Sequence, residues 1–295
     1  MNDRTKGALL TLFGGMCWGL SGSCGEYLFT VKGMDSRWLV PIRLGIAGVV
    51  LLLYCAYKYG KTTIEIWKKK EDIIDLLIYG LAGVSMCQFL YFSTIQLSSA
   101  AAGTILQDLS PVMILLSSCY LAHRKPKRYE SAAVFFALLG VFLLSTHGDL
   151  THLAIAPAAI LTGVLCAVCV TIYNVYPKRL LNTWPITVLQ GWAFLLGSIF
   201  FTVLFRPWNY HYIPDTAGYL GIGFVVLIGN VLAFPCYMAG VRMIGPEKGI
   251  LYGFSEPVTA ALVSSLVLKT SFTVYDLLGF ASMFVMLKII TSENP

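Results

Sequence analysis

Four charged side chains lie inside long apolar stretches of this chain: Glu26, Arg43, Asp108 and Glu256. A charge at the centre of a hydrocarbon layer costs about 2.5 to 3.5 kcal/mol on insertion scales. Such residues therefore pair with one another or face a cavity. Ion and proton binding is the chemistry that these residue types make available.

Two of the acids stand close to a proline. Asp108 lies three residues before Pro111, and Glu256 directly precedes Pro257. A proline inside a helix cannot donate to the carbonyl four residues earlier, so we expect each helix to kink at membrane depth. Such breaks are tolerated where they line a cavity or are buried in protein. Burial and a second nearby carboxylate both favour the protonated form of a carboxyl group, so either acid could carry a proton.

Other polar and aromatic side chains are expected at a similar depth. Tyr252 stands four residues before Glu256, which places both on one face of a regular helix. Hydrogen bonds between helices would explain the tyrosines and amides individually at least as well as a binding role. Together with Asp108 and Glu256, the residues that we expect to line a substrate site are Trp18, Gln88, Tyr91, Gln107, Tyr173, Asn230, Tyr237 and Tyr252.

Glu26 and Arg43 reach a similar level when residues are counted from the outer ends of their helices. We expect an ion pair that orients the first two helices as part of an outer gate. The alternative is that Glu26 is solvated at the headgroups while Arg43 binds backbone carbonyls.

The composition identifies the surroundings of these residues. The 295-residue chain is 57% hydrophobic and 12% charged, with a mean hydropathy of +0.74, whereas soluble proteins carry about 25% charged residues. Apolar stretches long enough to cross a bilayer recur along the whole chain. We predict an all-α integral membrane protein with ten transmembrane helices, at residues 8–29, 38–57, 73–95, 99–121, 130–146, 153–176, 184–205, 216–241, 248–268 and 273–291.

The basic residues predict how the chain is oriented. With the N-terminus inside, the inner segments hold 16 Lys and Arg and the outer loops hold 4. The positive-inside rule then places both termini in the cytoplasm. The net charge of +6 is explained by this topology, so we expect no nucleic-acid partner.

Several kinds of chemistry are disfavoured. The four histidines, His123, His147, His152 and His211, fall in predicted loops, so none is available at membrane depth for acid–base work or metal binding. The eight cysteines lie in or beside apolar spans, where thiols act as small hydrophobes. We expect neither a metal nor a cofactor, and not an enzyme.

An internal repeat divides the chain. Residues 91–118 align without a gap with residues 237–264 at an offset of 146, which pairs Tyr91 with Tyr237 and Pro111 with Pro257. We predict two five-helix repeats, 1–148 and 149–295. Because five is odd, the second repeat must be inverted relative to the first. This is the architecture of a secondary transporter with its site between the repeats near the bilayer midplane.

The chain resembles the EamA-type branch of the drug/metabolite transporter superfamily over essentially its whole length. The resemblance rests on CWGLSG at 17–22, PIRLGIAG at 41–48, LSPV at 109–112 and SEPVTAALVSSLVL at 255–268. It implies a ten-helix transporter of two inverted repeats, a central cavity, and export of amino acids or other small metabolites. Asp108 departs from the family, which more often has a neutral or aromatic residue there.

These observations predict a secondary active transporter that exports a small organic metabolite by alternating access, as a monomer or homodimer in a bacterial inner membrane. Asp108 among aromatic side chains would suit an amine through charge pairing and cation–π contact, and Asp108 or Glu256 could couple transport to protons. Alternatives are exchange or facilitated diffusion, a nucleotide-sugar carrier, or a membrane protein that does not transport.

Overall fold

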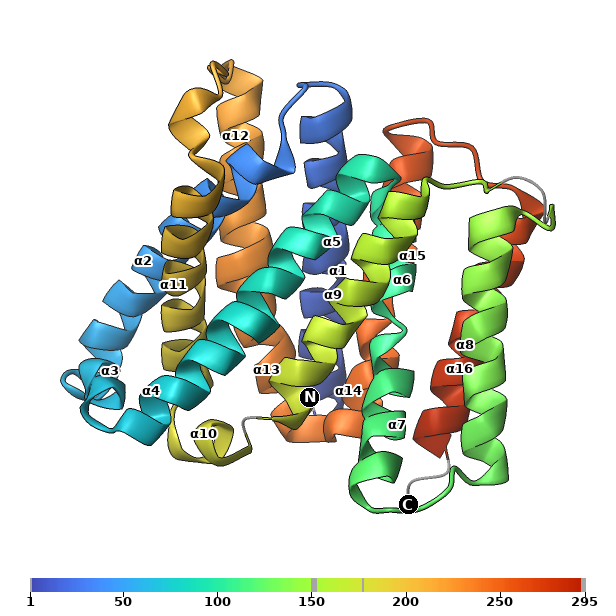
Figure 1. Ribbon diagram of the computed structural model, residues 1–295, viewed down its shortest axis with the longest axis horizontal. Coiled ribbons are helices and arrows are strands. Elements are labelled where there is room, and N and C mark those ends of the chain that lie inside the picture. The colour runs from blue at the N-terminus through green and yellow to red at the C-terminus, as the bar shows by residue number, and fades with distance from the viewer. Residues whose placement is uncertain (1, 150–152, 177, 293–295) are drawn as a thin grey trace.

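The structure is a computed structural model that describes residues 2–149, 153–176 and 178–292; His152 lies outside these residues. All regular secondary structure in the described residues is helical. Long helices stand side by side in Figure 1. The start of α1 (Asp3–Thr30), the end of α16 (Val274–Ser292) and the turn after α7 (Ser110–Leu121) lie in the lower half of that view.

The remaining helices follow in chain order. They are α2 (Ser36–Tyr59), α3 (Thr62–Glu65), η1 (Ile66–Lys68), α4 (Lys70–Leu77), η2 (Ile78–Ser85), α5 (Met86–Leu97), α6 (Ala100–Gln107), α8 (Arg128–Thr146), α9 (Pro157–Val175), α10 (Lys178–Thr183), α11 (Ile186–Phe205), η3 (Pro207–Asn209), α12 (Thr216–Phe224), η4 (Val225–Leu232), α13 (Ala233–Ile244), α14 (Pro246–Gly253) and α15 (Ser255–Leu266).

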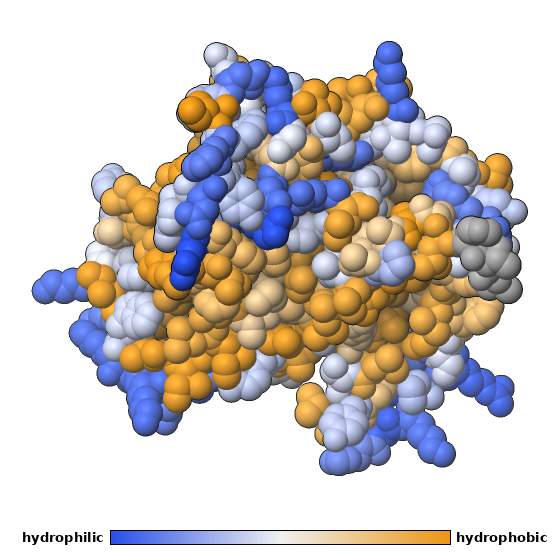
Figure 2. All heavy atoms as spheres, turned by 45° about the horizontal axis from the view of Figure 1, so that its top comes forward, coloured by the Kyte–Doolittle hydropathy of each residue, from blue (hydrophilic) through white to orange (hydrophobic). Residues whose placement is uncertain are grey.

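Eight helical segments of the described chain are long and apolar enough to cross a membrane. Figure 2 shows apolar side chains over the flank of the molecule and polar side chains gathered toward its ends. The other two predicted spans, α1 and α14–α15, are not among the eight. Helix α1 is rich in glycine and serine because it contacts α5, α6, α12, α13, α14 and α15, so less of its surface must dissolve in lipid. The number of ten spans stays a prediction.

The helices pack in pairs that join the two halves of the chain. Helix α2 packs on α11, α8 on α16, α1 on α13, α5 on α9, and α6 on α15. Two repeats related by a two-fold axis would contact each other in this way. The inverted relation of the halves is itself a prediction.

Two helices contain a π-helical segment. The helix 70–97 widens at η2, and the helix 216–244 widens at η4. Each segment includes a glycine against which another helix packs closely: a Cβ at Gly83 would lie 2.6 Å from the Cβ of Tyr173, and one at Gly229 would meet the side chain of Ser21. Segments of this kind occur frequently at functional sites.

Two other helices are interrupted. Helix α6 ends at Gln107 and α7 begins at Ser110, while α14 ends at Gly253 and α15 begins at Ser255. Pro111 and Pro257 therefore lie in the first turn of a new helix. A missing N–H is tolerated there because the first N–H groups of a helix have no partner within it. Each interruption is only one or two residues long, with Leu109 and Phe254 still in the right-handed helical region, and Asp108 lies in the first of them.

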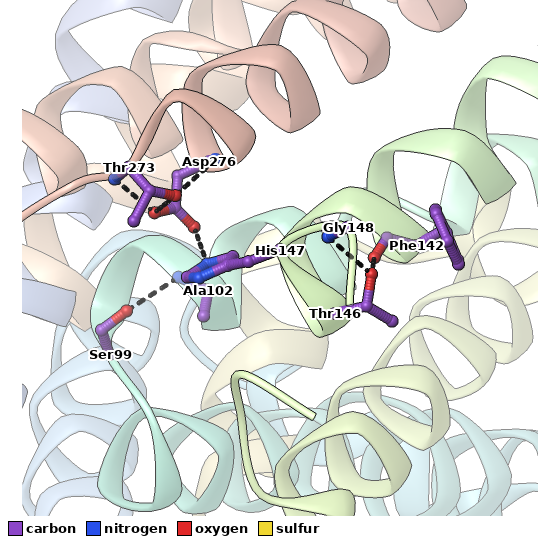
Figure 3. Close-up of polar contacts among 8 residues, drawn as sticks. All are labelled: Ser99, Ala102, Phe142, Thr146, His147, Gly148, Thr273 and Asp276. Atoms are coloured by element: carbon purple, nitrogen blue, oxygen red, sulfur yellow. Dashed lines mark hydrogen bonds and ion pairs between the residues drawn. The ribbon is translucent and has the colours of Figure 1, made fainter. Parts of the chain in front are cut away.

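Glu130 and Asp276, which lie in the first turns of α8 and α16, each accept a hydrogen bond from a backbone N–H three residues earlier. Glu130 accepts from the N–H of Lys127 at 2.6 Å, and Asp276 accepts from the N–H of Thr273 at 2.8 Å. Figure 3 shows the other oxygen of Asp276 facing His147, which ends α8, at 2.8 Å. This contact fastens α8 to α16.

Glu26 joins three helices. Its side chain is 4% exposed, and Oε2 accepts from the N–H of Ala100 at the start of α6 and from the hydroxyl of Ser264 in α15, both at 2.8 Å. The carboxylate lies at the N-terminus of α6, where the helix dipole favours a negative charge. One buried acid thus holds α1, α6 and α15 together.

We predict that Glu26→Ala lowers the temperature of thermal unfolding of the purified protein. The substitution leaves two buried donors without an acceptor, at about 1–3 kcal/mol each. The control is Glu65→Ala, because Glu65 pairs with Lys68 at the exposed surface, where such a pair contributes about 0–1 kcal/mol. Equal unfolding temperatures for the two variants would contradict the role of Glu26.

We also predict that Gly19→Ala destabilises the protein by about 1–3 kcal/mol through overpacking. A Cβ at Gly19 would lie 2.5 Å from the carbonyl oxygen of Glu256 and 2.8 Å from the Cβ of Thr259, so α1 and α15 would have to move apart. Gly223→Ala is the matched control, since a Cβ there meets nothing within 4 Å. Thermal unfolding compares the variants; an equal effect at both positions would refute the close packing.

Candidate functional site

A cavity of about 480 Å³ lies between the two broken helices. It extends from Trp18, at the centre of the helix packing, to Arg124 and Tyr129 at the turn between α7 and α8. Two smaller cavities, of about 150 and 90 Å³, share Trp18 and Tyr173 with it. The three are therefore adjacent and are treated together as one candidate site.

Trp18 forms a fixed wall of this site. Its Nε1 donates to the carbonyl of Gly229 in η4 at 3.0 Å. Its ring lies 4.9 Å from the ring of Tyr237, centroid to centroid, and 6.4 Å from that of Phe234. The π-helical segment thus presents a carbonyl that orients an aromatic side chain into all three cavities.

The two acids face the same cavity. Asp108 reaches it from the break between α6 and α7, and its Oδ2 is buried without a hydrogen-bond partner among the described residues. Glu256 reaches it from the first turn of α15, and its Oε1 accepts from the hydroxyl of Tyr91 at 3.2 Å. Neither acid forms an ion pair with a described residue. Two such carboxyl groups can bind a proton or an organic cation.

The amides have different surroundings. Gln107 lines the large cavity, and its Oε1 lies 3.4 Å from the Sγ of Cys166 and 3.9 Å from that of Cys87. Gln88 lines the two smaller cavities and accepts from Arg43. Asn230 is only 2% exposed and lines none of the three cavities; its Oδ1 also faces Arg43, at 3.5 Å. Two amides predicted to bind substrate therefore hold an arginine.

The expected ion pair between Glu26 and Arg43 is not formed. Glu26 is engaged by Ala100 and Ser264, and Arg43 by Gln88 and Asn230. Counting residues along two helices gives their depth but not the direction in which each side chain points. The two side chains face different neighbours.

Tyr252 is the one expected aromatic residue that lines none of the three cavities among the described residues. Its side chain is 37% exposed. The expectation assumed a continuous helix from Tyr252 to Glu256, whereas α14 ends at Gly253 and α15 begins at Ser255. The break turns Tyr252 away from Glu256.

Other lining residues escaped the sequence analysis. Asn174 lines the two larger cavities, beside Tyr173 in the last turn of α9. Its amide, near the end of an apolar span, was a usable signal. Phe234 and Met238 line the same cavities from α13, and nothing in their residue types separates them from lipid-facing side chains.

At the mouth, Arg124 and Glu130 form a two-point ion pair with N–O distances of 2.7 and 2.8 Å. The Glu130 carboxylate raises the pKa of the Arg124 guanidinium, so this arginine stays charged. The mouth is thus lined by a permanently ionised pair.

Comparison with protein families matches the EamA-like transporter family over residues 5–146 and again over 157–292. The uncharacterized inner membrane transporter YicL of Salmonella typhimurium is 32% identical over 95% of this chain and 93% of its own length. The riboflavin transporter ImpX of Fusobacterium nucleatum is 24% identical over 90% and 91%. A solved structure shares the fold with a TM-score of 0.65 at 18% identity, over 97% of both chains.

The match of both halves to one family, the relation to inner membrane transporters and the eight apolar helices agree with one another. The chain belongs to the EamA-like transporter family, within the drug/metabolite transporter superfamily, and is a multi-pass protein of the bacterial inner membrane.

Proposed function

We propose that this protein is a secondary active transporter that exports a small organic metabolite by alternating access, with ten membrane spans in two inverted repeats, 1–148 and 149–295. The observation that carries the proposal is the pair of carboxyl groups, Asp108 and Glu256, that face one cavity from two helix breaks. Helix breaks that surround a central cavity are the usual construction of a transport site. The protein is not an enzyme in this proposal.

The shape of the cavity supports alternating access. Its mouth lies at Arg124 and Tyr129, beside the basic segment 123–128 that the positive-inside rule assigns to the cytoplasm. On the other side Glu26 ties α1, α6 and α15 together, and Lys32 pairs with Asp215 at 2.6 Å across the start of α12. This arrangement corresponds to an inward-open state, and opening outward requires the Glu26 contacts to break.

The lining favours an amine, an amino acid or a related compound. Asp108 and Glu256 supply negative charge, while Trp18, Tyr173 and Tyr237 supply aromatic surface that attracts cations. The related ImpX is named a riboflavin transporter, but a two-acid site suits a cationic group better than a neutral flavin.

A nucleotide-sugar carrier is the second candidate. Arg43 is the observation in its favour, because it is a buried cation that lines the 90 Å³ cavity. Glu256 lines the same cavity and Asp108 lines the adjoining one, and together they would repel the two or more charges of a diphosphate, so this candidate is the weaker one.

The proposal is tested by ligand-induced stabilisation followed by transport. Purified protein is screened by thermal unfolding against amino acids, polyamines, quaternary amines and nucleosides, since a ligand of the native state raises the unfolding temperature. A stabilising compound is then followed in proteoliposomes. Absence of movement of every stabilising compound would refute transport by this chain.

We predict that Asp108→Asn and Glu256→Gln each reduce the uptake of a cationic substrate in proteoliposomes by about tenfold or more. Loss of one buried charge–charge contact costs a few kcal/mol, and about 1.4 kcal/mol corresponds to a factor of ten. Glu71→Gln is the control, because Glu71 is 84% exposed. Wild-type uptake in both cavity variants would contradict a substrate role for the acids.

We further predict that a pH gradient drives substrate accumulation in wild-type proteoliposomes and fails to do so in Asp108→Asn. The amide has the shape of the acid but cannot release a proton. The quantity compared is the ratio of uptake with and without the pH gradient within each protein, and a thermal unfolding temperature close to that of the wild type is the control for folding. Indifference of both proteins to the pH gradient would mean exchange or facilitated diffusion.

A further inference from the structure

Arg43 is a buried cation without an acidic partner. Its side chain is 1% exposed, and it forms no ion pair with a described residue. The guanidinium carbon lies 3.6 Å from the ring centroid of Phe92, and the terminal nitrogens face the amide oxygens of Gln88 and Asn230. The groups in direct contact with the guanidinium are therefore neutral, and the nearest acid of the site is Glu256, which lines the same 90 Å³ cavity without pairing with Arg43.

The arginine also has unused binding capacity. Its Nε is buried and has no hydrogen-bond partner among the described residues. The side chain lines the 90 Å³ cavity, which adjoins the larger one and shares Trp18, Gln107 and Glu256 with it as lining residues. A buried charge that lacks a counter-charge is unfavourable, and an uncompensated donor adds to this cost. An anion entering the small cavity would meet both needs.

Two purely structural roles fit Arg43 less well. The residue could serve only to join α2, α5 and η4 through Gln88 and Asn230, but this role leaves Nε unpaired and gives no reason for a full charge. Arg43 could be the counter-ion of Glu26, but the Oε2 of that acid accepts from Ala100 and Ser264, and no ion pair joins the two residues. Neither role accounts for an arginine that lines a cavity.

We propose that Arg43 is the anion-binding residue of the transport site and holds a small oxyanionic group, such as a carboxylate, of the transported molecule in the 90 Å³ cavity. This proposal rests on the proposed function and narrows its substrate class. Gln88 and Asn230 orient the guanidinium, and Phe92 supports it from one face. The cavity, of about 90 Å³, is large enough for a carboxylate and smaller than a whole sugar.

The test uses acetate as the probe and gluconate as its larger counterpart at equal ionic strength, with thermal unfolding of the purified full-length protein as the readout. We expect acetate to raise the unfolding temperature of the wild type saturably by about 2–4 °C, and gluconate not to. Arg43→Gln should abolish the acetate effect. Arg37→Gln, an exposed arginine on the same helix, should retain it. Inorganic phosphate shows whether the site prefers carboxylates.

Two further measurements keep the test decisive. If Arg43→Gln does not fold, Arg43→Lys is used instead. Lysine keeps the positive charge but lacks the planar donors that bind both oxygens of a carboxylate, so we expect at least a tenfold weaker acetate affinity. An acetate effect of equal size in wild type and Arg43 variants, or equal effects of acetate and gluconate, would overturn the proposal. Anion binding without transport of any compound would refute the proposed function alone, whereas transport without anion binding would refute only this inference.

Discussion

A polar group that is surrounded by hydrocarbon has to find its hydrogen-bond partner within the protein, and this requirement organises the molecule. Glu26 illustrates it, since one carboxylate satisfies a helix N-terminus and a serine on two other helices. Helix α1 can be short of apolar residues only because neighbouring helices enclose it. Satisfied groups of this kind hold the helices of the scaffold together.

Two of the buried polar groups without a hydrogen-bond partner among the described residues belong to charged side chains at the candidate site. Asp108 has a free buried oxygen at the first break, and Arg43 has a free buried nitrogen at the wall of the adjoining cavity. Their signs are opposite, and Trp18 and Tyr173 lie along the volumes that connect them. The site is therefore dipolar, and a substrate would be oriented by it as well as held.

How much of the candidate site could be predicted depends on whether a property is local to one segment of the sequence or depends on packing between segments. Asp108 and Glu256 could be identified because an acid in an apolar stretch is a local signal, and residue counting gives its depth. Direction around a helix axis was predictable only where the helix is continuous. The break at Phe254 turned Tyr252 outward, and α1 turned Glu26 toward Ala100 instead of toward Arg43. Partner identity across helices depends on packing that no single segment specifies.

The π-helical segments η2 and η4 have a further consequence. Each holds one more residue in its turn than an α-helix does. Because an α-helix advances by about 100° per residue, the added residue changes the direction in which all later side chains of that helix point. Gln88 and Tyr91 follow η2, and Phe234 and Tyr237 follow η4. The directions in which these four side chains point are thus set by the two π-helical turns that precede them. A one-residue deletion in either turn would rotate the residues that follow it by about 100° about the helix axis and so change which of them face the cavity.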